Sequence, residues 1–212
     1  MPQTAAALLI LAVVMNFLAI GTASLRSCIR AAALQGLLVS VFALLFTGIT
    51  TRLALLVLVA AVIKAVVIPS MLFRALREVH IRREVEPYLG LVPSVLLCAV
   101  GTGLTVLFAD NLPLAPEHHE LLVVPAALST MFAGFLLLTT RRKALSQVTG
   151  YLILENGIFV FAQLLHESMP LLVEVGVLLD LTVGIFVMGI VINHIQREFS
   201  SLDTERLAEL KD

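Results

Sequence analysis

The sequence predicts an all-α integral membrane protein, a bundle of about seven transmembrane helices with the N-terminus outside and the C-terminus in the cytoplasm. Three observations predict this fold. The 212 residues are 59% hydrophobic and 14% charged, with a mean hydropathy of +1.03, whereas water-soluble domains contain about 25% charged residues. The chain also divides into apolar segments of the ~20 residues that cross a bilayer. Its basic residues fall almost entirely on one side of that arrangement.

Short charged breaks, or breaks that contain Pro or Gly, separate the apolar segments. The first segment lacks the basic n-region and the Ala-x-Ala cleavage site of a signal peptide, so we expect a retained helix. The connecting loops are too short to hold an extramembrane catalytic domain. The predicted helices cover residues 4–24, 31–51, 53–73, 88–109, 121–140, 145–165 and 171–192.

The distribution of Lys and Arg predicts the orientation, because cytoplasmic loops carry the excess of positive charge. Seven crossings place all but two of the 14 basic residues on one side. Of those two, Arg52 lies on the other side and Lys64 lies within a segment. The net charge of -1 gives no overall basic field that would hold nucleic acid.

Ionisable residues inside the apolar segments indicate a function, because a charge at a helix centre costs roughly 2.5–3.5 kcal/mol on insertion. Lys64, Glu155 and Asp180 lie about 13–16 Å from the nearer end of their segments. That is the middle of a ~30 Å core. Desolvation disfavours the charged form of acids and bases alike, so protons pass between them with little energy difference. The pattern predicts a midplane proton relay, with Glu174, about 5 Å from the outer end of its segment, as a shallow outer step.

Each of these residues also has a structural interpretation. On this interpretation, Lys64 is a purely structural partner of a buried carboxylate, and the side chain of Glu174 extends to the outer surface. Asn16 near the midplane is more typical of a hydrogen bond between helices than of a pathway. The same holds for a stripe of polar residues that repeats along the sixth predicted helix and consists of Thr149, Asn156 and Gln163.

Three small or cyclic residues are expected to shape the bundle around the charges. Gly176 and Gly184 are spaced four residues to either side of Asp180, so all three share one helix face where close approach is possible. Pro69 removes a backbone hydrogen bond and is expected to kink the third helix just past Lys64.

Other chemistry is not indicated, and we expect no catalytic residue and no metal or cofactor bound by this chain. Cys28 and Cys98 have neither disulfide-framework nor metal-ligand spacing. No histidine lies in an apolar segment, which argues against haem between helices. The Glu-His-His-Glu run at residues 117–120 lacks further ligands. Phosphate loops and nucleophile elbows are not found.

The first three and the last three helices follow a similar plan, which divides the chain into four parts. In both, a basic turn precedes the second helix and the third carries a midplane charge. The basic loop at 74–87 and the amphipathic tail are each open to two interpretations, a solvated segment or a docking site for a partner. The parts are a three-helix unit with a cytoplasmic basic loop (1–87), a spacer helix and outer loop (88–120), a second three-helix unit (121–195) and a cytoplasmic tail (196–212).

The unit at 121–195 resembles the three-helix K subunit of respiratory complex I and the related subunit of Mrp-type cation/proton antiporters. The resemblance lies in Arg141-Arg142, Gly150, Asn156, and Asp180 followed by Gly184. In that family a glutamate in each of the last two helices belongs to the proton pathway. Asp180 takes the place of one of them. Leu152 occupies the other position, and Glu155 follows it by one helical turn.

Over nearly its whole length the chain resembles the hydrogenase-4 component E family. The motifs are residues 63–69 with Lys64 and Pro69, residues 150–157 with Tyr151 and Glu155, residues 172–176 followed by Asp180, and residues 202–211. The resemblance implies a membrane-arm subunit of a group 4 [NiFe]-hydrogenase or formate hydrogenlyase complex in a bacterial or archaeal cytoplasmic (inner) membrane. It implies antiporter-like subunits as neighbours in the lipid bilayer, and [NiFe] and iron–sulfur centres in peripheral hydrogenase subunits.

The sequence therefore predicts a subunit of an oxidoreductase complex that has no catalytic centre of its own and contributes Lys64, Glu155, Asp180 and Glu174 to proton translocation. Two alternatives stay open. One is a subunit of a cation/proton antiporter that has no redox partner. The other is a membrane anchor or assembly scaffold whose charges only fix helix pairing.

Overall fold

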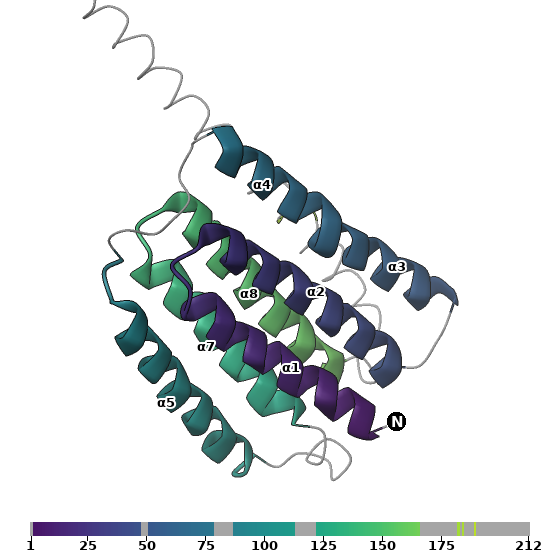
Figure 1. The fold of residues 1–212 in the computed structure, drawn as a ribbon. Helices are drawn as coiled ribbons and strands as arrows, with labels where there is room; N and C mark the ends of the chain where they lie inside the picture. Colours follow the sequence, from purple (N-terminus) through teal and green to yellow (C-terminus); the bar gives the residue numbers. More distant parts are fainter. Residues whose placement is uncertain are drawn as a thin grey trace, which may run out of the picture.

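The computed structural model describes residues 2–47, 51–78, 87–112 and 122–165, together with residues 182, 184 and 189. The elements in these ranges are all helices, and the longer ones run roughly side by side (Figure 1). They are α1 (Pro2–Ile20), α2 (Leu25–Thr47), α3 (Thr51–Val62), the π-helical turn η1 (Ile63–Val67), α4 (Ile68–Glu78), α5 (Leu91–Ala109), α7 (Val123–Thr140), α8 (Ala144–Ala162) and the 3₁₀ turn η2 (Gln163–Leu165).

Within the described ranges, six helical spans are long and apolar enough to cross a membrane. They match the first six predicted segments, with α3, η1 and α4 forming one span over Val57–Arg77. The predicted seventh helix at 171–192 lies outside the described residues, except for Thr182, Gly184 and Gly189, which are helical. The predicted orientation and the division into four parts stay predictions.

The predicted start of the second helix at residue 31 was wrong. Arg26 and Arg30 were expected in a turn, but α2 begins at Leu25 and includes both. Cys28 and Ile29 are buried on one face of this first turn, whereas Arg26 and Arg30 are exposed on the other. Long basic side chains at a helix end extend toward water while their stems cover apolar surface. Charge therefore marks the end of the apolar core here, but not the end of the helix.

The third span is not a uniform α-helix, because η1 interrupts it at Ile63–Val67. The N–H of Ile68 bonds to the carbonyl of Ile63, a five-residue spacing that widens the turn. The next residue, Pro69, has no N–H to donate. The irregularity expected near Pro69 thus lies just before it, in the turn that contains Lys64. Such π turns occur inside α-helices frequently at functional sites.

Helices α7 and α8 form the closest pair in the bundle, and glycines allow it. A Cβ atom on Gly134 would lie 2.3 Å from the backbone nitrogen of Leu154, and one on Gly157 would lie 2.6 Å from that of Met131. Helices α1 and α2 pack on this pair. The α3–η1–α4 span lies along one edge of the bundle and α5 along the opposite edge (Figure 1). The six described spans therefore form one packed bundle.

Apolar residues also cover the outside of the bundle. On α5, Val92, Leu96, Leu104 and Leu107 are each more than half exposed. Polar side chains such as Asn16 and Gln35 are instead fully buried. This distribution suits a chain whose solvent is lipid, where the surface is apolar and polar groups satisfy one another inside.

Arg141, in the turn between α7 and α8, forms a hydrogen bond with the end of α1. Arg141 is only 2% exposed, and its Nη2 donates a hydrogen bond of 2.6 Å to the carbonyl of Ile20. Ile20 is the last residue of α1, where the final carbonyls lack partners within the helix. The guanidinium therefore supplies a partner to one of the last carbonyls of that helix.

Arg141→Met is expected to lower the free energy of unfolding by about 1.5–3 kcal/mol, because it removes a charged donor from a buried carbonyl. The control is Arg142→Met, where the guanidinium lies 4.6 Å from the ring centroid of Tyr88 at an exposed site. Loss of that contact costs about 0.5–1 kcal/mol. Thermal unfolding in detergent measures both variants, and an equal loss of stability would contradict a bracing role for Arg141.

Candidate functional site

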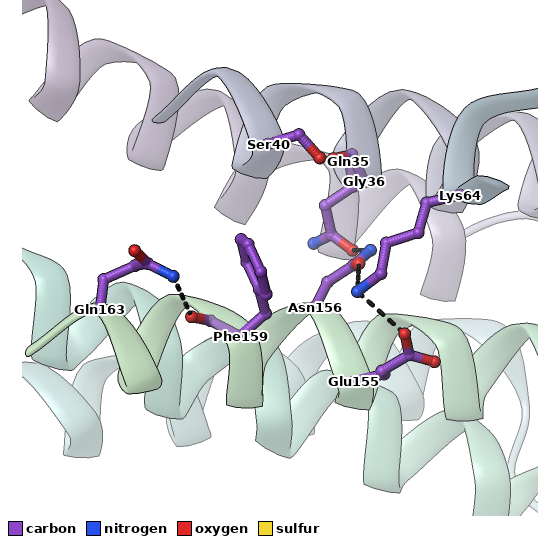
Figure 2. A network of polar contacts seen from close by, with 8 residues as sticks. All are labelled: Gln35, Gly36, Ser40, Lys64, Glu155, Asn156, Phe159 and Gln163. Carbon is purple, nitrogen blue, oxygen red and sulfur yellow. Dashed lines mark hydrogen bonds and ion pairs between the residues drawn. The ribbon is translucent and has the colours of Figure 1, made fainter. Parts of the chain in front are cut away.

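A buried ion pair joins the π-helical turn to α8. The Nζ of Lys64 lies 2.9 Å from Oε1 of Glu155 (Figure 2). The Lys64 side chain is 7% exposed and that of Glu155 is 2% exposed. Desolvating two charges costs several kcal/mol per ion, so each charge depends on the other as its partner. The pair lies in the interior of the bundle and connects residues distant in the sequence.

Two further groups surround the ammonium. Nζ of Lys64 donates a hydrogen bond of 3.4 Å to Oδ1 of Asn156, and the ring centroid of Phe159 lies 5.0 Å from Nζ. All three partners, Glu155, Asn156 and Phe159, come from α8. One helix therefore supplies a carboxylate, an amide oxygen and an aromatic face to a single cation.

Glycines make room for the pair on two sides. A Cβ on Gly36 of α2 would lie 3.2 Å from Cβ of Lys64. A Cβ on Gly184 would lie 3.3 Å from Oε2 of Glu155, the oxygen that is not in the ion pair. Larger residues at either position would crowd the charged groups.

A small cavity of about 10 Å³ lies beside the pair. This volume is at the lower limit for one water molecule, roughly 10–15 Å³. The pair is therefore closely packed, with little room for solvent. The cavity is lined by Ile29, Ala32, Ala33, Lys64, Pro69, Leu72, Leu152, Glu155 and Asn156.

From Asn156, a chain of buried polar side chains continues across the bundle. Asn156 Nδ2 donates to Gln35 Oε1 at 3.3 Å, and Gln35 Nε2 donates to Asn16 Oδ1 at 2.6 Å. Asn16 Nδ2 then donates to Thr130 Oγ1 at 3.1 Å. These residues come from α8, α2, α1 and α7, so the chain links four helices to the turn that holds Lys64.

The structure brings together some of the predicted site residues and leaves others apart. Lys64, Glu155 and Asn156 are in direct contact, and Asn16 reaches them through Gln35. Pro69 lines the cavity. Three predicted residues, Glu174, Gly176 and Asp180, lie outside the described residues.

The polar stripe predicted along the sixth helix does not act as one unit. Thr149 donates to the carbonyl of Leu145, and Gln163 donates to the carbonyl of Phe159. Each bond reaches back four residues along the chain, and Figure 2 shows the one made by Gln163, the first residue of η2. Tyr151 packs against the apolar cluster that borders the cavity, but it does not itself line the cavity. A seven-residue repeat keeps side chains on one face but spaces them two turns apart, too far for direct contact.

Gln35, Gly36 and Thr130 also belong to the site but were not predicted from the sequence. Gln35 is fully buried between two amides. Its signal was an uncharged polar residue inside an apolar segment, the same signal that marked Asn16. Gly36 and Thr130 carry no such signal, because small residues and threonines are common in membrane helices.

This arrangement is suited to proton exchange. An acid and a base whose nitrogen and oxygen lie 2.9 Å apart, removed from water, are within the distance for direct proton transfer. In the described part of the chain, no group of three or more His, Cys, Asp or Glu side chains is placed to hold a metal ion. The described site is therefore an acid–base pair, Lys64 and Glu155, with an amide partner in Asn156.

Comparison with known proteins gives two kinds of relative. The chain is 34% identical over 193 residues to the uncharacterized protein Rv0085 of Mycobacterium tuberculosis. This match covers 89% of this chain and 87% of that protein. It is also 34% identical over 117 residues to Hydrogenase-4 component E of Escherichia coli K12. That match covers 55% of this chain and spans about half of the relative's length, 51%. No family model and no solved structure matches the chain.

Proposed function

This chain belongs to the same family as the uncharacterized protein Rv0085, and from that membership and its partial match to Hydrogenase-4 component E we propose a subunit role. The protein is a non-catalytic membrane subunit of a hydrogenase-type complex. It resides in the cytoplasmic membrane beside antiporter-like subunits. The redox centres, [NiFe] and iron–sulfur, are held by peripheral subunits of the same complex.

The observation that carries this proposal is the buried Lys64–Glu155 pair in a bundle of apolar spans. Its contribution is one step of proton translocation coupled to redox chemistry elsewhere. A proton on the ammonium moves to Oε1 of Glu155 and leaves a neutral amine and a neutral acid in contact. The reverse transfer restores the ion pair. Neither state places an isolated charge in the bilayer core, where an unpaired charge is costly.

The next step is assigned to the acids of the seventh predicted helix, Asp180 and then Glu174. Gly184 supports this direction, since it lies against Oε2 of Glu155, the oxygen on the far side from Lys64. Asp180 precedes Gly184 by one helical turn in the sequence. A proton is expected to pass from Glu155 to Asp180 directly or through one water.

The test replaces both members of the pair, Lys64→Met together with Glu155→Leu, in the assembled complex. Neutral apolar residues of similar volume often maintain or raise stability where a buried ion pair stood. The complex is therefore expected to assemble and to keep its electron transfer. Coupled proton movement into inverted membrane vesicles is expected to fall to background.

The matched control is Arg77→Met, which removes a charge from an exposed position on α4 of the same span. It is expected to leave coupling unchanged. Normal proton movement in the double variant would contradict the proposal and favour a scaffold whose charges only pair helices. Proton movement in a complex that contains no nickel-binding subunit would instead favour an antiporter.

A further inference from the structure

The amide chain that begins at Asn156 has a fixed direction. Gln35 Nε2 donates one hydrogen bond to the carbonyl of Ala12 at 3.0 Å and another to Asn16 Oδ1 at 2.6 Å. The carbonyl of Ala12 can only accept, so the nitrogen of Gln35 must face it. Both amide hydrogens of Gln35 are then in use, and its oxygen faces Asn156.

The orientation of the amide at the other end of this hydrogen-bonded series, Asn156, is fixed as well. An ammonium can only donate, so the oxygen of Asn156 must face Lys64. That leaves the nitrogen of Asn156 to donate to Gln35 Oε1, as observed at 3.3 Å. The two ends thus demand the same arrangement, in which every acceptor points toward Lys64 and every donor points away, toward Thr130.

We propose that Gln35 is a positioning residue, which holds Asn156 with its oxygen toward Lys64 and so keeps the ammonium between Glu155 and Asn156. Aligned hydrogen bonds polarise one another, so each link strengthens the next. Gln35 carries no charge and does not itself exchange a proton. This inference rests on the proposed function for its effect on translocation, but the positioning of Lys64 is measurable by itself.

Burial and packing support a positioning role. Asn16 and Gln35 are fully buried, and Asn156 is 2% exposed, so bulk water does not offer them alternative partners. Gly36, next to Gln35 in α2, lets the helix approach Lys64 and Asn156 closely. Figure 2 shows Gln35, Asn156, Lys64 and Glu155 converging between the two layers of helices.

The test uses Gln35→Met, which keeps the length of the side chain and removes its donor and acceptor. The chain contains only three lysines, Lys64, Lys143 and Lys211. Lysine labelled with ¹⁵N at Nζ therefore gives few signals by NMR of the full chain in lipid bilayers, and Lys64→Arg assigns that of Lys64. The Lys64 signal is expected to shift in Gln35→Met while the other two stay. In the assembled complex, coupled proton movement is expected to fall about tenfold.

The control is Ser40→Ala, since Ser40 is buried on the same helix but its hydroxyl donates to the carbonyl of Gly36. Ser40→Ala is expected to leave both the ¹⁵N signal of Lys64 and the coupled proton movement unchanged. If Gln35→Met does not assemble, Asn16→Ala removes one acceptor of Gln35 and is read in the same way.

An unchanged Lys64 signal in Gln35→Met overturns the inference. A shifted signal with undiminished translocation overturns it as well, provided that the double variant Lys64→Met with Glu155→Leu is inactive. If the double variant still translocates protons, the positioning of Lys64 stands and the proposed function fails.

Discussion

Glu155→Leu alone is expected to lower the free energy of unfolding by about 3–5 kcal/mol, because it leaves the ammonium of Lys64 buried without its counter-charge. The same substitution combined with Lys64→Met is expected to be less destabilising than Glu155→Leu alone. Removing both charges abolishes the desolvation cost together with the attraction, whereas removing one keeps the cost. The pair is 2.9 Å apart and both side chains are buried, so solvent screening is weak.

A double-mutant cycle in detergent measures this coupling, with Lys64→Met as the remaining corner. The cycle reports how much the stability effect of one substitution depends on the presence of the other. Equal destabilisation by Glu155→Leu with and without Lys64→Met would show that the two charges are independent, and would remove the basis of the site.

Gly134→Val is expected to have a comparably large effect, a loss of about 3 kcal/mol or more, because it forces α7 and α8 apart. Even one added carbon at Gly134 would lie 2.3 Å from the backbone nitrogen and 2.6 Å from Cα of Leu154. A backbone neighbour cannot rotate away as a side chain can, so the whole helix must move. Leu154 adjoins Glu155, and we therefore expect the substitution to disturb the ion pair as well as the packing.

The matched control is Gly103→Ala on α5, where an added Cβ would meet nothing within 4 Å. Alanine is favoured over glycine inside a helix by about 1 kcal/mol, so this variant is expected to be neutral or slightly stabilising. Thermal unfolding of both variants in the same detergent measures the difference. A fully stable Gly134→Val would mean that α7 and α8 pack less closely than the described geometry indicates.

The sequence predicted six of the apolar spans correctly, because the length of a span is a local quantity. The length of a span follows from bilayer thickness, and the depth of Lys64 and Glu155 follows from the rise per residue. The contact between these two residues agrees with the depths predicted for them. Their role in proton transport stays a prediction, as do the roles of Asp180 and Glu174.

What the sequence could not predict depends on which helices are neighbours and how each is rotated. Hydropathy does not reveal that α2 lies between the turn holding Lys64 and α1, so Gln35 was overlooked as the link between Asn156 and Asn16. The π turn was missed for a related reason. Pro69 signals a missing hydrogen bond, but not whether the helix bends or widens to accommodate it.

The distance in sequence between Lys64 and Glu155 also bears on how the protein is made. Ribosomes deliver the span with the lysine before the helix with the carboxylate, and α5 and α7 are synthesised between them. Until α8 is synthesised, the span that contains Lys64 must enter the bilayer before Glu155 is present to pair with it. Inserting such a charge costs roughly 2.5–3.5 kcal/mol. Nascent chains that stop before α8 are therefore expected to retain this span poorly in the bilayer and to be substrates for membrane proteases.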